Sequence, residues 1–292
     1  MILQASVIIP TFEDWDRLQK CLDCLANQSV APDLFEVIVA NNNASGTLPA
    51  LPDLPVNARV IHATKPGSYA ARNAALRDAR GEVLFFTDSD CLPDRRWIEA
   101  GLARIATLGP TGRVTGKVEL FPKGPGWTGA ELFDRVFSFD QKHFLRNGWA
   151  VTANLVVRRA AFDLVGPFDE DRFSGGDRTW NMRATQLGCD LVFSEDALVL
   201  HPARASFAEL AMKVRRLYGG EYRDQEQGLK PKRPLVSYLG FLTINDFRKV
   251  GLASGLSTME RIKLLWICFR LGLVRFFEAA RLRCFSGEPR RS

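Results

Sequence analysis

Two carboxylates separated by one residue come shortly after a fully apolar stretch of the chain. The stretch is Val83-Leu84-Phe85-Phe86, and Asp88-Ser89-Asp90 follows it. Two like charges this close repel each other unless something neutralises them. A hard divalent cation with oxygen ligands would do so, and it could also bind a diphosphate. The tripeptide alone leaves this metal site and an Asp-rich turn about equally open.

A second candidate group lies upstream, where Gly67-Ser68-Tyr69 begins a predicted helix and Arg72 follows shortly after its start. A helix N-terminus favours anions, and a guanidinium is a forked donor suited to phosphate. We therefore expect Arg72 to contact a phosphate group, although a solvated helix residue would look the same in the sequence. Lys65 is a weaker candidate of this kind.

Strand and helix patterns alternate over the first part of the chain. Hydrophobic periodicity predicts strands at 6–10, 36–40, 60–63 and 83–87. It predicts helices after an Asp14 or Asp16 cap, at 68–79 closed by Gly81, and from Pro93 to 108. This alternation is typical of a parallel sheet covered by helices, which binds ligands at the carboxyl ends of its strands. The polar residues at those ends are Pro10-Thr11-Phe12-Glu13, Asn41-Asn42-Asn43 and Asp88-Ser89-Asp90.

From residue 112 the pattern is less regular. We expect strands at 113–120, 154–157, 191–193 and 198–200, and helices at 130–145 and 177–187. Beyond His201 the sequence reads as helical and basic, with a loop at 228–234.

Composition is that of a globular protein. The 292 residues are 46% hydrophobic and 25% charged, and the six cysteines are too scattered for a disulfide framework. The apolar N-terminus stops at Pro10 without a basic segment before it, so we expect no signal peptide and a cytoplasmic location. We also expect no membrane span.

Charge divides unevenly along the chain. Residues 1–202 hold 21 Lys/Arg and 25 Asp/Glu, a net charge of −4, whereas residues 203–292 hold 18 and 8, a net charge of +10. A basic segment of this kind favours anionic lipid, nucleic acid or simple solvation. No nucleic-acid-binding motif accompanies it, so we expect no nucleic-acid partner.

Several segments, in order and spacing, resemble the family 2 glycosyltransferases. They are Ser6–Phe12, Glu36–Val39, Ala71–Ala75, Gly81–Asp90, Asn154–Arg159, Gly166–Glu170, Gly175–Asp177, Arg183 and His201-Pro202. The resemblance implies an α/β GT-A fold, a Rossmann-like mixed sheet flanked by helices. It would occupy residues 1–205, with a nucleotide-sugar half at about 1–110 and an acceptor half at about 111–205. Residues 206–292 would be a basic amphipathic helical extension.

The resemblance also implies roles for single residues. Asp88 and Asp90 match the DxD motif that binds Mg²⁺ or Mn²⁺ and the donor, and Asp177 matches the general base of an inverting transfer. In some relatives a histidine at the position of His201 joins the metal. The remaining predicted donor contacts are Pro10, Thr11, Glu13, Asn41, Arg72 and Ser89, and the predicted acceptor or sugar contacts are Asn154 and Gly176.

Two positions depart from the family pattern. Asn41 stands where an Asp usually reads the nucleobase, which leaves UDP- and GDP-type donors open, and Gly176 stands where Glu usually precedes the base. The processive members' Gln-x-x-Arg-Trp motif is replaced by Lys213–Tyr218. We expect one sugar to be added to a lipid-linked or cell-surface glycan acceptor. A sugar nucleotidyltransferase and a regulator that has lost catalysis are the alternatives.

The basic extension predicts contact with a membrane surface. Residues 259–283 mix large apolar side chains with arginines, as helices of the membrane interface do. We expect the protein to be peripheral on the cytoplasmic face, although a helix packed on the catalytic body or on a second subunit would look similar. The residues predicted to face lipid are Trp266, Phe269, Phe276 and Phe277, with Arg270, Arg275, Arg281 and Arg283.

Overall fold

The computed structural model describes residues 3–44, 53–172, 174–238 and 240–285. The chain forms two compact units. The sheet unit holds residues 1–119, 141–172 and 176–201, and the helical unit holds 120–140, 173–175 and 202–292. The helical unit thus includes residues 120–140, which the sequence analysis assigned to the acceptor half, besides the predicted extension.

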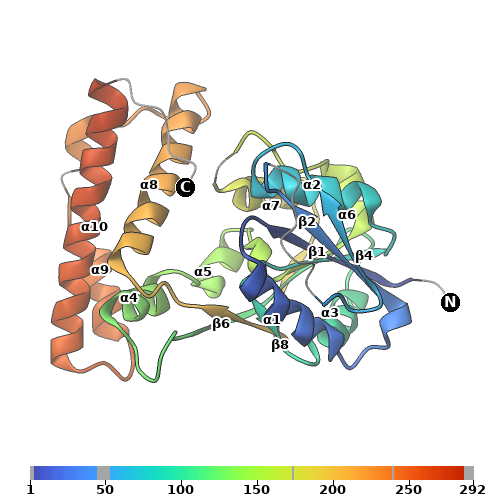
Figure 1. Ribbon diagram of the computed structural model, residues 1–292. Coiled ribbons are helices and arrows are strands. Elements are labelled where there is room, and N and C mark those ends of the chain that lie inside the picture. The colour runs from blue at the N-terminus through green and yellow to red at the C-terminus, as the bar shows by residue number, and fades with distance from the viewer. Residues whose placement is uncertain (1–2, 45–52, 173, 239, 286–292) are drawn as a thin grey trace. The chain divides into compact units, whose positions relative to one another are not determined.

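An eight-stranded mixed sheet organises the sheet unit (Figure 1), in the order β3-β2-β1-β4-β7-β6-β8-β5. Strands β1, β2, β3 and β4 are parallel neighbours, whereas β7 is antiparallel to β4 and to β6, and β5 is antiparallel to β8. The strands are β1 (Ala5–Thr11), β2 (Phe35–Asn41), β3 (Ala58–His62), β4 (Val83–Phe86), β5 (Leu92–Pro93), β6 (Arg113–Phe121), β7 (Leu155–Arg158) and β8 (Leu191–Pro202).

Helices cover both faces of this sheet because successive strand residues point to opposite sides. Leu84 and Phe86 of β4 pack in the cluster that includes buried residues of α2 (Ser68–Asp78), α6 (Arg159–Val165) and α7 (Gly176–Gln186). Phe85 points the other way, where its ring meets Trp97 of α3 (Trp97–Ala106) at 5.0 Å. The fully apolar sequence of β4 is therefore explained by burial on both faces.

Further short elements complete this unit. They are α1 (Trp15–Ala26), α5 (Gln141–Arg146) and the 3₁₀ turns η1 (Pro32–Leu34) and η2 (Thr152–Asn154). The four residues predicted to form the inner face of α1 are the four that it buries: Leu18, Cys21, Leu22 and Leu25.

The helical unit is built on four helices that pack on one another. They are α4 (Gly129–Phe137), α8 (Phe207–Glu226), α9 (Ile244–Leu252) and α10 (Thr258–Cys284), with the 3₁₀ turn η3 (Leu235–Tyr238). One apolar cluster joins Ala130, Leu210 and Leu271, and Asp134 lies buried beside Arg204 and Lys213. None of the helices in the described ranges combines the length and hydropathy that a membrane span requires.

Several predicted elements differ from the observed ones. Pro93 does not open a helix but lies in β5, and the helix predicted at 130–145 is two helices, α4 and α5. The strands predicted at 191–193 and 198–200 are one strand, β8, and α6 was not predicted. Gly81 does not close α2, which ends at Asp78; instead, a Cβ at Gly81 would lie 2.3 Å from the backbone carbon of Ala5.

Candidate active site

The carboxyl ends of the three central parallel strands bring the predicted donor residues to one edge of the sheet. In the register of β1 and β2, Thr11 lies opposite Asn41, and in that of β1 and β4, Ile8 lies opposite Phe86. Because the strands run in the same direction, the segment that follows Phe86 emerges beside the end of β1. The local strand pattern therefore places Asp88-Ser89-Asp90 next to the predicted nucleotide residues.

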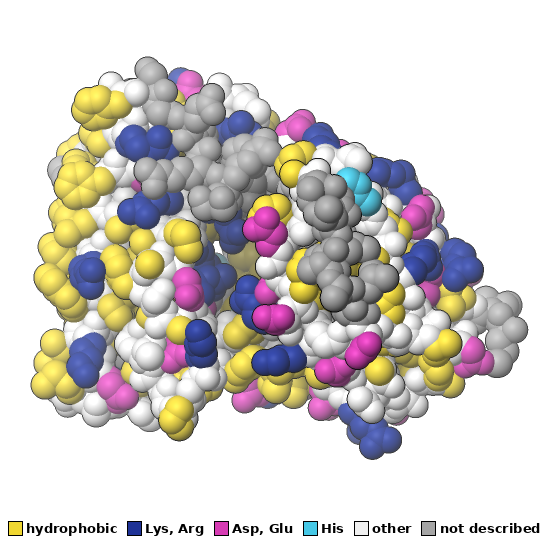
Figure 2. Space-filling view, viewed as in Figure 1, with side chains coloured by type: hydrophobic (Ala, Val, Ile, Leu, Met, Phe, Trp, Pro, Cys, Tyr) yellow, Lys and Arg dark blue, Asp and Glu magenta, His cyan; other side chains and the backbone are white. Residues whose placement is uncertain are grey.

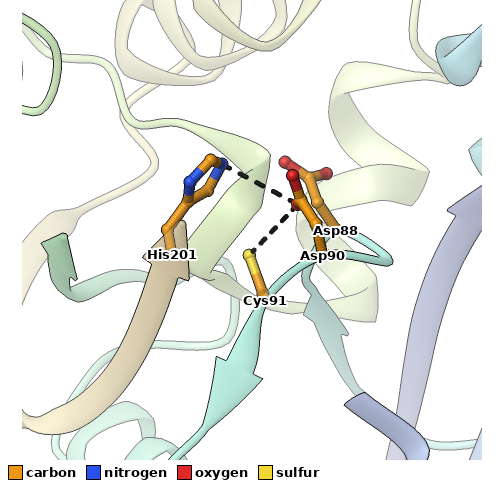
Figure 3. Close-up of side chains that lie close together, drawn as sticks. All are labelled: Asp88, Asp90, Cys91 and His201. Carbon is orange, nitrogen blue, oxygen red and sulfur yellow. Dashed lines mark hydrogen bonds and ion pairs between the residues drawn. The ribbon is translucent and has the colours of Figure 1, made fainter. Parts of the chain in front are cut away.

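Pairing of β5 with β8 brings His201 to the two aspartates. Leu92 lies opposite Leu200, so the preceding Cys91 and the following His201 are neighbours across the antiparallel pair. His201 Nε2 lies 3.8 Å from Asp90 Oδ1, and Cys91 Sγ lies 4.0 Å from the same oxygen (Figure 3). One potential ligand atom from each of Asp88, Asp90, Cys91 and His201 lies within 4.8 Å of the others.

This cluster fits a divalent cation. Carboxylate oxygens suit Mg²⁺ and Mn²⁺, and an imidazole nitrogen suits transition metals. Burial raises the pKa of Asp90, His201 opposes that rise, and the negative charge of Asp88 adds to it. A bound cation would offset this crowding of negative charge, with Asp88, Asp90 and His201 as the residues that hold it.

Two arginines neutralise part of the carboxylate charge. The buried guanidinium of Arg72 hydrogen-bonds Asp88, while Arg17 contacts Asp14 Oδ1 at 2.6 Å and Asp90 Oδ2 at 3.5 Å. Asp14 is the N-cap residue of α1, but its side chain makes no capping hydrogen bond, and its other oxygen accepts a hydrogen bond from Ser89 Oγ at 3.0 Å.

Asp177 lies in the first turn of α7, where two protein groups donate to the same carboxylate oxygen. The Arg178 N–H donates to Asp177 Oδ1 at 2.8 Å, and the Tyr69 hydroxyl donates to it at 3.2 Å. Among the described residues, no donor reaches Asp177 Oδ2. Burial raises the pKa of Asp177, and the Arg178 N–H, the Arg72 charge and the Tyr69 hydroxyl oppose that rise. A carboxylate with a raised pKa and an oxygen without a donor is suited to accept a proton.

Gly176 lets the Tyr69 ring lie against the start of α7. A Cβ built at residue 176 would lie 2.7 Å from the ring carbon Cε2, closer than real contacts allow. Tyr69 itself is buried against Phe168, with ring centroids 5.8 Å apart, so the ring has little freedom to move. The absence of a side chain at residue 176 therefore leaves room for the Tyr69 ring in the position from which its hydroxyl reaches Asp177.

The predicted nucleotide residues include two buried polar atoms without a partner in the described part of the chain. These atoms are Thr11 Oγ1 and Asn41 Nδ2. Asn41 Oδ1 accepts a hydrogen bond from the Asn43 N–H at 3.0 Å, which orients the amide so that its NH₂ group is left over. Buried polar groups usually have partners, and these two atoms are available to hydrogen-bond a ligand at this edge of the sheet. Glu13 nearby adopts a φ of 51° and donates its N–H to Asn43 Oδ1.

Asn154 is placed differently from the other predicted contacts. Its side chain is completely buried, and its Oδ1 accepts a hydrogen bond from Trp97 Nε1 at 2.9 Å. Its NH₂ group donates to the carbonyls of Lys117 and Ala197. Asn154 thus joins α3 to β6 and β8, and contact with a sugar would require these bonds to break.

Sequence reasoning missed Tyr69, Cys91 and Asp14 as site residues. Tyr69 lies three residues before Arg72, so both side chains fall on the same side of α2, and this spacing was a usable signal. Cys91 directly follows the Asp88-Ser89-Asp90 motif, but a free cysteine is more often a small buried apolar residue than a metal ligand. Nothing local distinguishes Asp14 from any other helix-capping residue.

Comparison with known proteins identifies the family of this chain. The family described as "Glycosyl transferase family 2" matches residues 6–171. The chain is also 36% identical over 225 residues to Glycosyltransferase AglE of Haloferax volcanii, covering 74% of this chain and 72% of that protein. This chain belongs to glycosyl transferase family 2.

A further relative and two solved structures resemble this family 2 glycosyltransferase. A PGL/p-HBAD biosynthesis glycosyltransferase of Mycobacterium bovis is 29% identical over 215 residues, covering 70% of this chain and 76% of that protein. The fold resembles mannosyltransferase PcManGT of Pyrobaculum calidifontis, solved with GDP-Man and Mn²⁺ (TM-score 0.62, 16% identity, 99% of this chain and 89% of that one). It also resembles S. aureus TarS 1–349 in complex with UDP-GlcNAc (TM-score 0.54, 17% identity, 97% and 92%). The GT-A fold predicted from the sequence is thereby confirmed, and the chain is a glycosyltransferase.

Proposed function

We propose that this glycosyltransferase is inverting and non-processive, and that it moves one sugar from a UDP- or GDP-type donor to a lipid-linked or cell-surface glycan acceptor. The observation that carries the proposal is that one helix, α2, contacts both the donor motif and the predicted base. Arg72 of α2 contacts Asp88 of the donor motif, and Tyr69 of the same helix contacts Asp177. A single base next to a donor site is what an inverting displacement needs.

In the proposed transfer, Asp177 acts on the acceptor and the donor motif acts on the leaving group. The acceptor hydroxyl oxygen attacks the anomeric carbon while the bond from that carbon to the diphosphate oxygen breaks. The nucleoside diphosphate leaves with the electron pair, and Asp177 takes the hydroxyl proton. A divalent cation held by Asp88, Asp90 and His201 would offset the charge that builds on the diphosphate. Thr11 and Asn41 offer the unpaired polar atoms that bind the nucleoside.

Addition of a single sugar is supported by the segment that replaces the processive motif. Residues 213–218 lie in α8, where Lys213 Nζ donates to Ser138 Oγ at 2.7 Å and Tyr218 Oη accepts from Arg283 at 3.0 Å. These side chains hold the helical unit together. The proposed acceptor class is supported by relatives named as a poly(ribitol-phosphate) beta-glucosyltransferase and a PGL/p-HBAD biosynthesis glycosyltransferase.

The decisive experiment is a turnover assay with Asp177→Asn. This change keeps the shape of the side chain but removes the proton acceptor, and loss of a general base typically lowers kcat by about 10²–10⁴. Donor affinity, measured by calorimetry with UDP- and GDP-sugars and Mn²⁺, should stay near that of the wild type. Asp163→Asn, on α6, is a matched control. Turnover close to the wild type in Asp177→Asn, or a product with retained anomeric configuration by NMR, would refute the proposal.

A further inference from the structure

The outward face of α10 is apolar along nearly the whole helix. At 100° per residue, positions 259, 262, 266, 269, 273 and 277 fall on one side. Four of these side chains are largely exposed: Met259 (60%), Ile262 (57%), Trp266 (58%) and Phe277 (65%). Figure 2 shows hydrophobic side chains gathered along the edge of the helical unit that α10 forms. An exposed apolar stripe of this length indicates an interaction surface.

Phe269, at the border of this stripe, packs on Phe241 with ring centroids 5.6 Å apart, whereas the four exposed side chains are not needed to hold the helical unit together. The opposite side of α10 does that, through the buried residues Leu264, Cys268, Leu271, Ala279 and Leu282. On the outward side, the rings of Trp266 and Phe269 stack at 5.5 Å and form a flat aromatic surface. Neighbouring α9 adds three more exposed apolar side chains: Ile244, Phe247 and Leu252. We call the outward residues of α9 and α10 the apolar face.

Basic residues border the apolar face. Lys263 and Arg270 are exposed and lie one heptad apart along α10, and Arg248 is exposed on α9. The Arg270 guanidinium lies 3.8 Å from the ring centroid of Phe207, which holds the charge beside the stripe. This arrangement, apolar in the middle and basic at the border, is typical of helices that lie in a membrane interface.

Contacts inside the helical unit limit which arginines of α10 can reach a bilayer. Arg275 donates to the carbonyl of Gly240, and Arg283 donates to Tyr218 Oη and to Gln225, so both point into the helical unit. Arg281 forms an ion pair with Glu278, and Phe276 packs with Tyr218 and Tyr238. Arg275, Arg283 and Phe276, which the sequence analysis expected to contact lipid, are thus engaged inside the helical unit, whereas Trp266, Phe277 and Arg270 are exposed.

We propose that the apolar face docks on the surface of a bilayer that contains anionic lipid, with α10 lying in the plane of the interface. Charge favours this partner over a second copy of the chain. Two copies joined through α10 would bring Lys263 and Arg270 of each close together, in a segment whose net charge is +10 over residues 203–292. Anionic headgroups instead attract these side chains. The inference does not depend on which donor or acceptor the enzyme uses.

Flotation of the 292-residue chain with lipid vesicles tests the proposal. The wild type should float with phosphatidylcholine vesicles containing phosphatidylglycerol at low salt, and float less at high salt or with phosphatidylcholine alone. The triple variant Ile262→Ser, Trp266→Ser, Phe277→Ser should lose this binding. The double variant Lys263→Gln, Arg270→Gln should bind about tenfold or more weakly.

A charge-matched control distinguishes binding through the apolar face from a general attraction by the net charge of the helical unit. Arg216→Gln with Lys232→Gln removes two exposed basic residues outside α9 and α10. This variant should float as the wild type does, and circular dichroism should confirm that all variants are folded. The proposal is overturned if the wild type ignores anionic vesicles at low salt, or if the control loses as much binding as Lys263→Gln, Arg270→Gln. A dimer in analytical ultracentrifugation that the triple serine variant dissociates, without vesicle binding, would assign the face to a second copy.

Discussion

The Tyr69 hydroxyl donates a hydrogen bond to Asp177 Oδ1 across 3.2 Å, although the two residues are 108 positions apart in the chain. Three residues after Tyr69, Arg72 contacts Asp88 of the donor motif. One face of α2 therefore holds both the predicted base and the first carboxylate of the predicted metal site. Because both contacts are made by one rigid helix, the distance between base and donor is set by the packing of α2 on the sheet.

Replacing Tyr69 with Phe should slow turnover and move its pH dependence. The base must be deprotonated to act, and the Tyr69 hydroxyl stabilises the charged form of Asp177. Its loss raises the pKa of Asp177 further, so the acidic limb of the kcat profile should shift to higher pH. We expect kcat near the limb to fall about tenfold, with a smaller loss at higher pH and little change in the donor KM. An unchanged limb in stopped assays across pH would show that Tyr69 has no effect on the base.

Replacing Gly176 with Ala should disturb the same contact from the other side. The new Cβ would overlap the buried Tyr69 ring, which cannot move away because it packs on Phe168. Overpacking of this kind costs about 1–3 kcal/mol, and kcat should fall with it. Gly109→Ala is the matched control, since a Cβ there meets nothing within 4 Å. If Gly176→Ala matches Gly109→Ala in both urea unfolding and turnover, this account of Gly176 is wrong.

Metal affinity should depend on Asp90 and His201 together. Asp90→Asn removes a charged ligand atom and His201→Ala removes the imidazole 3.8 Å from it, so each should weaken Mn²⁺ binding. The free-ion EPR signal of Mn²⁺ measures this directly, with and without nucleotide. Asp23→Asn, an exposed change on α1, serves as the control. If Asp90→Asn binds Mn²⁺ as tightly as Asp23→Asn does, the cluster does not hold the cation.

Glu36 should make folding stability depend on pH. Burial would raise its pKa, but hydrogen bonds from Arg59, Ser6 and the Arg80 N–H outweigh burial and lower it. A carboxyl group with a lowered folded pKa stabilises the protein above its unfolded pKa, and this contribution is lost as pH falls through the folded pKa.

Glu36→Gln tests this directly. The variant should lose about 2 kcal/mol of unfolding free energy at pH 7, because it weakens hydrogen bonds to a charged acceptor. The difference from the wild type should shrink in acid, as urea unfolding at several pH values would reveal. A difference that stays constant with pH would show that Glu36 does not contribute through its charge.

Local pattern in the sequence was sufficient for the parallel strands and for α1. Strands β1, β2 and β4 are short apolar runs followed by polar residues, and the inner face of α1 is visible at helical spacing. These signals depend only on near neighbours, so they place Thr11, Asn41 and Asp88 at strand ends without knowledge of the rest of the chain. Family resemblance then added Asp177 and His201, which no local pattern identifies.

Tertiary structure alone decided the contacts between distant residues. Residue spacing within the chain could not show that Tyr69 reaches Asp177, that β5 pairs with β8 to bring His201 beside Asp90, or that Asn154 is enclosed by Trp97. Nor could it tell Arg270 from Arg283, since both lie on one basic helix, and only the packing of α10 on α8 turns Arg283 inward to Tyr218. Periodicity gives the direction of a side chain relative to its own helix or strand, whereas what that side chain meets depends on how the elements pack.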